Sequence, residues 1–600
     1  MNLSFHAVAH KHASSGAPLL FPHSRTGRLP LISNKFLLRT LKTSAVCRFV
    51  PFTKSKNLTL RAEVSAGNKK DPERPLALPV TLRELLQKAN VSPASINGDA
   101  NVLIRGIQHD SRLVQAGDAF ICCRGFSTDG HIYAADAARN GAVAIISTDP
   151  ISAEGFPLTF VHVKDTNAIL SALSAAFYGN PSHKLTVVGI TGTNGKTTTA
   201  YLVKSILETM NLKTGLLGTI AHDIGSGSII SASNTTPDAL SLQFYLASML
   251  ANNAKACVME VSSHALAQGR CIALDFDLAV FTNLTRDHMD FHKTEERYKE
   301  SKAILFAMMV DPLRHRKIVN ADDPHAPYFL EQGNPSVPVL KFSLNNRDAD
   351  VYASNVVLSL FKTQFIAHTN AGSMRITSNL LGKHNVYNIL AAIAVGIAAN
   401  IPLSVIAAGV EAVDVVPGRC EVLKQGQNFV VLVDYAHTPD ALARLLDTVR
   451  DCGAERVITV IGCGGDRDKG KRPIMAKIAA EKSEICILTS DNPRTEDPWS
   501  IINEMLTGIG MTLEDHLEQD TRNGILMLDP AQRLIICEDR RKAIKLAISK
   551  GKEGDAVIVA GKGHENYQIL GNRKEHFDDR EECQRALQDL ITNAYHASQE

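Results

Sequence analysis

Acidic residues are absent from the first 62 positions of the sequence, where ten lysines and arginines precede the first acid, Glu63. A basic leader without acids that is rich in serine and threonine is typical of an organelle transit peptide. Its weak amphipathicity and many hydroxyl groups favour a plastid over a mitochondrion. A disordered basic tail is the alternative interpretation. We predict a transit peptide and disordered linker over residues 1–75, and a chloroplast protein of the plastid stroma.

The sequence also lacks long apolar runs and cysteines at CxxC spacing, and its net charge is small. No run of about 18 apolar residues occurs, so we expect no transmembrane helix and no membrane partner. The formal net charge of +2 indicates no polyanionic partner, so direct nucleic-acid binding is not expected. The eleven cysteines have no CxxC spacing. That absence argues against a zinc clip and fits reduced thiols in an intracellular compartment.

The stretch 185–199, LTVVGITGTNGKTTT, contains the strongest local signal. Residues 185–190 predict a buried strand, a glycine-rich turn follows, and 200–210 predict a helix. Such a strand–turn–helix unit binds anions, because backbone N–H groups and the positive end of the helix dipole face the ligand. Lys196 is expected to reach nucleotide phosphates and Thr197 to contact Mg²⁺. Ile190 replaces the first glycine of the strict P-loop pattern, and a chance glycine-rich turn is the alternative.

Polar residues follow further predicted strands of this region. Glu260 ends the strand predicted at 257–261, and a buried acid without a partner is costly, so we favour a Mg²⁺ ligand. His288 follows the strand predicted at 278–281 and is either a second metal ligand or a surface residue. Lys302 lies in a helix predicted at 298–306, where by itself it would be a solvated lysine. Asn385 and Asn388, at the start of a predicted helix, either contact a purine or cap the helix.

The regions on either side are also α/β. Strands predicted at 102–107, 119–123 and 142–147, with a helix at 131–139, indicate a small domain in the N-terminal region. Strands at 429–433, 457–461, 485–489 and 556–560 alternate with helical stretches, which predicts a doubly wound domain. Polar stretches follow these last strands, and the carboxyl ends of parallel strands share one sheet edge. We therefore predict a ligand site there.

Six motifs occur in an order that resembles the Mur ligase family, over about Thr81 to Leu590. They are 192–197 (GTNGKT), 260–264 (EVSSH), 287–290 (DHMD), 417–419 (PGR), 434–437 (DYAH) and 491–494 (DNPR). The MurE-type branch, which adds diaminopimelate, is the most similar. The resemblance implies three α/β domains: a UDP-substrate domain at 76–182, a central P-loop-type ATPase domain at 183–424 and a Rossmann-like amino-acid-binding domain at 425–600.

The resemblance also implies site residues, with ATP and Mg²⁺ as cofactors. Lys302 matches a carbamylated lysine that, as an anion, binds metal. The implied metal ligands are Thr197, Glu260, His288 and Lys302 as its carbamate. The implied catalytic residues are Lys196, Glu260, His288, Lys302 and Arg419. The implied ATP contacts are Gly192, Thr193, Asn194, Gly195, Lys196, Thr197, Thr198, Asn385, Asn388, Arg419 and Asp434.

Two further sets are implied for the other substrates. Contacts to the UDP substrate are expected from Ser111, His131, Thr235, Thr236, Ser262 and Arg270. Contacts to the amino acid are expected from Arg467, Asp491, Asn492, Arg494, Gly561 and Glu565. A guanidinium binds a carboxylate through two charge-assisted hydrogen bonds, and diaminopimelate has a second carboxylate that lysine lacks. Arg494 therefore favours meso-diaminopimelate over lysine.

The function implied is ATP-dependent addition of meso-diaminopimelate to UDP-MurNAc-L-Ala-D-Glu through an acyl phosphate, for plastid peptidoglycan precursors. The alternative is a non-catalytic homologue that is a partner of the plastid transcription machinery, as some plant homologues are. A folylpolyglutamate-type ligase shares the phosphate loop but gives no reason for Arg494 or for a UDP domain. Residues 508–528 form a longer connection than the family's usual one, and we expect an acidic surface loop there.

Overall fold

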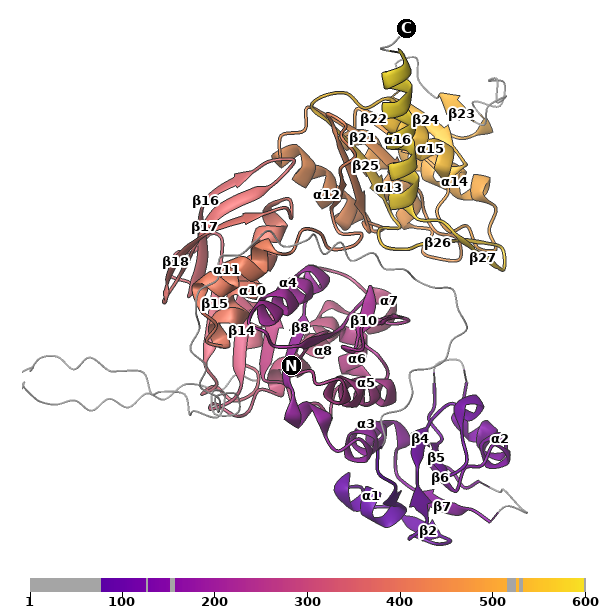
Figure 1. Ribbon diagram of the computed structural model, residues 1–600. Helices are drawn as coiled ribbons and strands as arrows, with labels where there is room; N and C mark the ends of the chain where they lie inside the picture. Colours follow the sequence, from indigo (N-terminus) through magenta and orange to yellow (C-terminus); the bar gives the residue numbers. More distant parts are fainter. Residues whose placement is uncertain (1–76, 126–127, 152–156, 515–524, 528–532, 598–600) are drawn as a thin grey trace, which may run out of the picture. The chain divides into compact units, whose positions relative to one another are not determined.

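The computed structural model describes residues 77–125, 128–151, 157–514, 525–527 and 533–597 (Figure 1). The predicted transit peptide and most of the stretch 508–528 lie outside the described residues. The described chain contains three large sheets, of five, eleven and seven strands, each built from a different region of the sequence. These sheets confirm the predicted division into three α/β parts. None of the helices in the described ranges has the length and apolar character needed to span a membrane.

The N-terminal part is a five-stranded sheet with four parallel strands and one antiparallel edge. Across the sheet the strands are β2 (Ser95–Asn97), β7 (Thr159–His162), β6 (Ala144–Ser147), β5 (Asp118–Ile121) and β4 (Gly106–Gln108). The single strand predicted at 102–107 is wrong: β3 (Leu103–Ile104) pairs with β1 (Val80–Thr81), and β4 joins the main sheet. The chain changes partner at Arg105, whose N–H donates to the carbonyl of Gly117 instead.

The central part is an eleven-stranded sheet with β8 (Thr186–Thr191) between β12 (Ala256–Glu260) and β13 (Leu278–Phe281), all parallel. The remaining strands are β9 (Thr214–Leu217), β10 (Ala221–Asp223), β11 (Ile229–Ser231), β14 (Arg316–Asn320), β15 (Val339–Ser343), β16 (Val351–Leu358), β17 (Thr363–Thr369) and β18 (Gly372–Ser378). The sequence analysis did not predict the antiparallel extension β16–β18.

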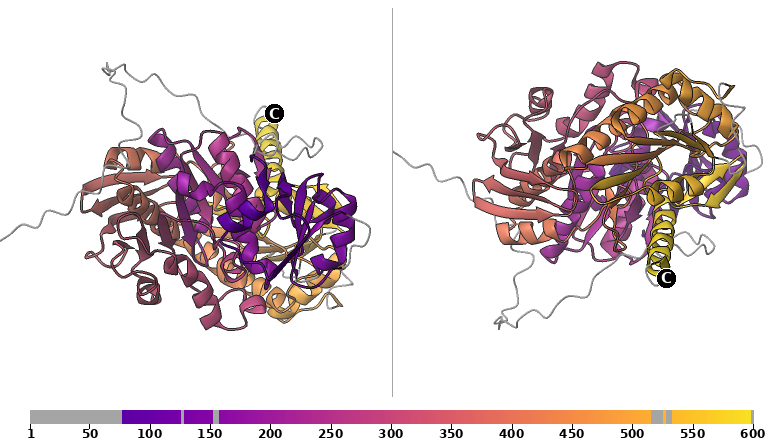
Figure 2. Two further views of the ribbon diagram at one scale, coloured as in Figure 1. Left: turned by 90° about the horizontal axis from the view of Figure 1, so that it is seen from below. Right: turned by 90° about the horizontal axis from the view of Figure 1, so that it is seen from above.

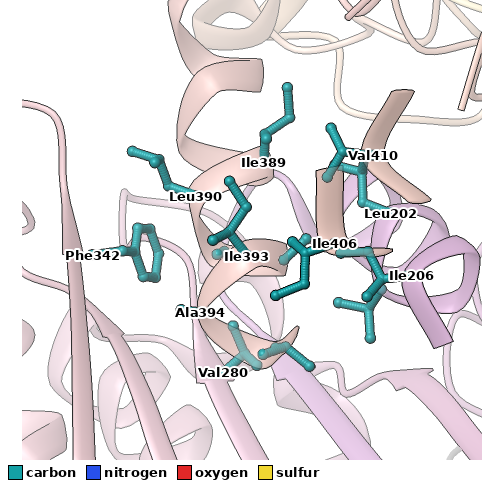
Figure 3. Close-up of a cluster of buried hydrophobic side chains, with 14 of the residues drawn as sticks. Leu202, Ile206, Val280, Phe342, Ile389, Leu390, Ile393, Ala394, Ile406 and Val410 are labelled. Carbon is teal, nitrogen blue, oxygen red and sulfur yellow. The ribbon is translucent and has the colours of Figure 1, made fainter. Parts of the chain in front are cut away.

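Helix α4 (Lys196–Thr209) packs against α10 (Lys383–Ala398) and α11 (Leu403–Glu411). In Figure 3, Ile206 of α4 lies beside Ile406 of α11, with Ile393 of α10 next to them. A Cβ on Gly409 would lie 2.6 Å from the Cα of Ile206, so α11 approaches α4 closely because this position has no side chain. The helix that follows the phosphate loop is therefore held by a tightly packed apolar core.

The C-terminal part is a seven-stranded sheet with helices on both faces, as Figure 2 shows. Across the sheet the strands are β19 (Glu421–Leu423), β20 (Val430–Asp434), β25 (Asp555–Ala560), β21 (Arg456–Ile461), β22 (Ile485–Leu488), β24 (Leu534–Cys537) and β23 (Ile525–Met527). The five inner strands are parallel, which confirms the predicted doubly wound arrangement. Helices α15 (Arg540–Ser549) and α16 (Asp579–Ala597), the latter yellow in Figures 1 and 2, pack against each other.

Candidate nucleotide and amino-acid sites

The loop between β8 and α4 has a backbone that only glycine accommodates at two positions. Gly192 has φ +144° and Gly195 has φ +85°. A Cβ on Gly192 would lie 1.9 Å from Thr282 Oγ1, and one on Gly195 would lie 2.2 Å from Asn388 Oδ1. The loop is also tied to its neighbours, because the hydroxyl of Thr193 donates to the Thr285 carbonyl at 3.0 Å. A rigid loop of this shape brings backbone close to a ligand.

The first turn of α4 is suited to an anion. Its N-cap, Gly195, has no side chain to accept from the amides of the first turn, and no acid lies in that turn. The predicted helix start at residue 200 is wrong, since α4 begins at Lys196 and so includes Lys196, Thr197 and Thr198 of the predicted ATP contacts. Lys196 Nζ donates to the carbonyls of Gly192 (3.0 Å) and Thr193 (2.8 Å). Burial lowers the pKa of Lys196, and the Glu260 carboxylate opposes that shift.

We expect Gly195→Ala to weaken ATP binding by about tenfold or more, because the added Cβ displaces the loop or Asn388. The matched control is Gly227→Ala. Gly227 has φ +86°, so it has the same backbone strain, but nothing lies within 4 Å of its Cβ position. Titration calorimetry with ATP and Mg²⁺ measures both variants. Equal losses of affinity would show that close packing of the loop is not what matters.

Glu260, at the end of β12, is buried with 1% exposure and is surrounded by donors. Its Oε2 accepts from the hydroxyls of Thr197 and Thr219, both at 3.0 Å, and its Oε1 accepts from the N–H of Thr219 at 2.9 Å. Carboxylate and hydroxyl oxygens gathered at a phosphate loop are the donor type that Mg²⁺ prefers. The sequence analysis missed Thr219. Its position just after β9, beside β12, was the available signal.

Lys302 on α8 (Glu295–Ala307) is not the solvated lysine that its helix alone predicts, since its exposure is 2%. Its Nζ donates to the Gly192 carbonyl at 2.9 Å and lies 4.5 Å from the ring centroid of Tyr298. Among the described ion pairs none involves Lys302. Burial lowers its pKa well below the ordinary lysine value, and the nearby Lys196 adds to that shift. A buried amine without an acid partner favours the neutral form.

His288 has a left-handed backbone (φ +56°), and its Nε2 lies 3.4 Å from Asp287 Oδ2. Burial lowers its pKa, and Asp287 opposes that shift. The sequence analysis missed the two histidines beside it: His264 is 4.7 Å from His288 and 5.4 Å from His292, between ring centroids. His292 is buried and its nitrogens lie 2.9 Å from Ser263 Oγ and 3.3 Å from Ser301 Oγ. Both flanking histidines therefore support the loop that carries His288.

Four of the residues predicted for the UDP substrate lie beside Glu260. The hydroxyl of Thr236 donates to the Glu260 carbonyl at 2.9 Å and accepts from the N–H of Ser262 at 3.0 Å. Arg270 Nη1 donates to the Thr236 carbonyl at 3.0 Å. The hydroxyl oxygen of Thr235 lies 3.1 Å from that of Thr219. The structure thus brings this set together with Glu260, Thr197 and Thr219, which we call the Glu260 group.

Ser111 and His131 lie in the N-terminal part. Ser111 is buried and its carbonyl accepts from Asn140 Nδ2 at 2.8 Å. His131 Nδ1 lies 2.5 Å from Asp129 Oδ1, and its Nε2 accepts from the N–H of Thr148 at 3.1 Å. Asp129 also accepts from the N–H of His131 and so caps the short helix at Gly130–Tyr133. Because both ring nitrogens have protein partners, His131 is held in one orientation.

Asn385 and Asn388 are buried in the first turns of α10. Asn385 Nδ2 donates to the Leu381 carbonyl at 2.8 Å, and Asn388 Nδ2 donates to Asn385 Oδ1 at 2.9 Å. Asn388 Oδ1 lies beneath Gly195 of the phosphate loop. The pair therefore supports the loop from below, and its contact with adenine stays a prediction.

In the C-terminal part, Asp434 ends β20 and both its oxygens accept from backbone, from Cys420 N–H at 2.7 Å and Ala436 N–H at 2.8 Å. Burial raises the pKa of Asp434, and Arg419 opposes that shift. The guanidinium carbon of Arg419 lies 5.0 Å from the ring centroid of Tyr435. Its Nε is buried with no hydrogen-bond partner among the described residues. Arg419 therefore retains a donor for a ligand.

The predicted amino-acid contacts lie at the ends of β22 and β25 and in the loops beside them. Asn492 Nδ2 donates to Glu565 Oε2 at 2.9 Å. A Cβ on Gly561, which has φ +115°, would lie 3.0 Å from Asp491 Oδ2. Arg494 has a left-handed backbone (φ +54°), its N–H donates to the Ile569 carbonyl at 3.0 Å, and its Nη1 donates to the Gly465 carbonyl at 2.7 Å.

The guanidinium groups of this pocket lack acidic partners. Neither Arg494 nor the exposed Arg467 forms an ion pair with a carboxylate of the described residues. Asp491 is buried, and its Oδ1 has no hydrogen-bond partner in the described part of the chain. The pocket therefore offers separate cationic and anionic groups to a ligand, which suits a zwitterion with an additional carboxylate.

Three family models match the chain: the Mur ligase family catalytic domain over residues 103–178, the Mur ligase middle domain over 190–396 and the Mur ligase glutamate ligase domain over 418–563. Two relatives and one solved structure show the extent of the similarity. The chloroplastic MurE homologue of Arabidopsis thaliana, named as a UDP-N-acetylmuramoyl-L-alanyl-D-glutamate–2,6-diaminopimelate ligase, is 50% identical over 511 residues, which are 84% of this chain and 66% of that protein.

The ligase of the same name from Geobacter sulfurreducens is 44% identical over 498 residues, 82% of this chain and 96% of the bacterial protein. A solved structure of a UDP-N-acetylmuramoyl-L-alanyl-D-glutamate–2,6-diaminopimelate ligase matches with a TM-score of 0.61 and 32% identity. The match covers 86% of this chain and 100% of that one. The chain thus spans about two thirds of the plant relative and nearly all of the bacterial one.

Proposed function

The chain belongs to the Mur ligase family of ligases, and we propose that it adds meso-2,6-diaminopimelate to UDP-MurNAc-L-Ala-D-Glu at the expense of ATP. The observation that carries the proposal is the C-terminal cluster of predicted amino-acid contacts, where Arg494 has no acidic partner among the described residues and lies near Asn492, whose carbonyl is 3.4 Å from Nη1. The names of the bacterial and plant relatives support the same substrates.

The reaction we propose has two steps. The γ-carboxylate of the D-glutamate residue attacks the γ-phosphate of ATP, which forms an acyl phosphate as the bond to the leaving ADP breaks. The amine of diaminopimelate then attacks the acyl carbon, and phosphate leaves from a tetrahedral intermediate. Lys196 and Arg419 stabilise the charge of the transferred phosphoryl group, and bound Mg²⁺ supplies further positive charge there. Gly192, Thr193, Asn194, Gly195 and Thr198 supply the backbone and side chains of the loop.

Thr197, Glu260, His288 and Lys302 are the ligands we propose for Mg²⁺, with Lys302 as a carbamate. Carbamate formation joins Nζ of the neutral amine to the carbon of CO₂ and releases one proton. Lys302 supports this step because it is buried, has no ion-pair partner among the described residues and has a pKa shifted toward the neutral amine. The carbamate replaces the neutral amine by an anion next to the phosphate loop, which suits a divalent cation.

Domain limits and location are part of the proposal. We assign the UDP substrate to residues 76–182 together with the Glu260 group, ATP to 183–424 and diaminopimelate to 425–600, and we retain residues 1–75 as a plastid transit peptide and linker. The chloroplastic label of the plant relatives supports a plastid location. Synthesis of plastid peptidoglycan precursors follows from this location and this reaction.

We expect Arg494→Ala to lower kcat/KM for meso-diaminopimelate by about 10²-fold, because the second carboxylate loses its charge-assisted hydrogen bonds. Activity with L-lysine, which has no such carboxylate, changes little. Arg494→Lys keeps the charge but not the planar fork and is expected to lie between the two. Phosphate release with ATP, Mg²⁺ and UDP-MurNAc-L-Ala-D-Glu measures all three proteins with each amino acid.

The wild-type protein in the same assay tests the proposed function itself. Phosphate release that depends on diaminopimelate supports the ligase. No turnover with either amino acid, from folded protein that binds ATP, would refute it and favour the non-catalytic partner of the plastid transcription machinery.

A further inference from the structure

Lys562 follows β25 and is completely buried at the edge of the amino-acid pocket, yet the motifs assigned no role to it. Its Nζ donates to the Tyr567 carbonyl at 2.5 Å and to Asn492 Oδ1 at 3.3 Å. It also lies 3.4 Å from Glu565 Oε2 and 3.7 Å from Asp491 Oδ1. One ammonium group therefore contacts three of the side chains proposed to bind the amino acid.

The contact between Lys562 and Asn492 determines which way the side-chain amide of Asn492 faces. Oδ1 of Asn492 accepts from Lys562 and from the N–H of Ile569 at 3.0 Å. The two donors place oxygen on that side, so Nδ2 points to Glu565 and donates to its Oε2 at 2.9 Å. Lys562 and Asn492 thus converge on the same oxygen of Glu565, and the other carboxylate oxygen makes no described hydrogen bond.

The charges of the pocket do not balance within the chain. Asp491 and Glu565 share the single ammonium of Lys562, and Asp491 Oδ1 has no hydrogen-bond partner among the described residues. The group formed by Asp491, Glu565 and Lys562, taken apart from the guanidinium groups of Arg494 and Arg467, has one surplus negative charge, which attracts a cation. Without Lys562 the surplus would be two charges, and a carboxyl would take up a proton and lose its attraction for a cationic ligand.

We propose that Lys562 is a positioning and specificity residue of the amino-acid site: it orients Asn492 and holds the carboxylates of Asp491 and Glu565 in place for the ammonium group of a diamino dicarboxylic acid. The inference deepens the proposed function and rests on it. Lys562 itself touches no substrate in this role. It acts through the three side chains that its ammonium group contacts.

Two readouts separate this role from a merely structural one. We expect Lys562→Met to raise KM for meso-diaminopimelate by about 30-fold and to leave kcat and the KM values for ATP and the UDP substrate within about threefold. We also expect the acidic limb of kcat/KM for diaminopimelate to move to higher pH. Burial raises the pKa of Glu565 and Lys562 opposes that shift, so removal of the ammonium raises the pKa further.

The other groups that act on Glu565 remain in the variant. Asp491 at the end of β22 raises the pKa of Glu565, while Tyr435 after β20 and Tyr567 on β26 (Tyr567–Leu570) lie near its carboxylate. Burial raises the pKa of Tyr567, and Arg494 and Arg467 oppose that shift. None of these is changed by the substitution, so a shift of the pH profile reports the loss of Lys562.

Lys317→Met is the matched control. Lys317 is equally buried, at 1% exposure, and donates to the carbonyls of Leu330 and Asn334, but it lies on β14 of the central part. We expect Lys317→Met to lower stability, because three partly buried backbone carbonyls lose their donor, without changing KM for diaminopimelate. Lys562→Gln is the second variant, because its amide still donates hydrogen bonds inside the pocket and so preserves folding if Lys562→Met does not. It is expected to show the same KM increase and pH shift.

Titration calorimetry with meso-diaminopimelate alone distinguishes failure of the role proposed for Lys562 from failure of the proposed ligase function. If the affinity for diaminopimelate is about 30-fold lower in the Lys562 variants than in the wild type, the role of Lys562 is supported even when no turnover occurs. Absent turnover by itself refutes only the ligase. Equal affinity and an unchanged pH profile in wild type and variants would overturn the inference and leave the ligase standing. Wild-type protein that binds no diaminopimelate would overturn both.

Discussion

Lys302→Met is expected to abolish turnover while making the protein more stable. Turnover falls by at least about 10³-fold, because the thioether forms no carbamate and leaves the Glu260 group with one metal ligand fewer. Relative to the protein with an unmodified Lys302, stability rises by about 1–4 kcal/mol, since a buried amine without an acid partner is replaced by an apolar side chain of similar length. Phosphate release measures the first effect and thermal unfolding the second.

The control for this substitution is Lys299→Met on the same helix. Lys299 is half-buried, and its ammonium lies 4.6 Å from the ring centroid of Tyr328. It contacts none of the phosphate-loop residues, so we expect wild-type turnover and at most a loss of about 1 kcal/mol. Solution NMR with ¹³C-labelled bicarbonate detects the carbamate directly, as a signal absent from Lys302→Met. A fully active Lys302→Met variant would refute the proposed metal site.

Arg540→Met is expected to destabilise the C-terminal part by about 3–5 kcal/mol, because it leaves Asp579 buried without its charge partner. Arg540 and Asp579 are both completely buried and form two hydrogen bonds of 2.7 Å. Arg540 also donates to the carbonyls of Ser490 at 3.3 Å and Ala560 at 2.9 Å, at the ends of β22 and β25. The substitution therefore also loosens the two strand ends that carry the amino-acid pocket.

Lys545→Met is the control, because Lys545 and Asp589 link the same two helices, α15 and α16, through an exposed ion pair. Exposed pairs contribute about 0–1 kcal/mol, so little change is expected. Trp499, the only tryptophan in the sequence, packs against the core of the C-terminal part, and its fluorescence in urea follows that part. Similar losses of stability in Arg540→Met and Lys545→Met would show that burial of the Arg540–Asp579 pair is unimportant.

Much of the fold and many of the site residues could be predicted because their signals are local. The strand at 278–281 is observed with those limits, and the three α/β regions follow from runs of apolar residues separated by polar strand ends. The glycines at 192 and 195 are needed by a backbone conformation that five or six adjacent residues define. The predicted ends of helices and strands were less accurate where a turn borders the element. Helix α4, for example, begins at Lys196, inside the glycine-rich motif.

Burial and partners could not be predicted in the same way. The periodicity of α8 says that Lys302 is on a helix, but only the packing of that helix against the phosphate loop removes the lysine from water. Thr219 and Glu260 are 41 positions apart and meet because β9 and β12 are neighbours in the sheet. Arg540 and Asp579 are 39 positions apart and meet where two helices begin.

By itself, the sequence determined the three α/β regions and their order, the glycines of the phosphate loop and the family to which the chain belongs. Each of these depends on residues that are adjacent along the chain or on a fixed order of short motifs. The tertiary structure alone decided that Lys302 and Lys562 are buried, and which carboxylates and carbonyls surround them. The charge of a lysine is well solvated in water, whereas its burial in a core costs free energy. The side chains that surround a buried lysine come from distant parts of the chain.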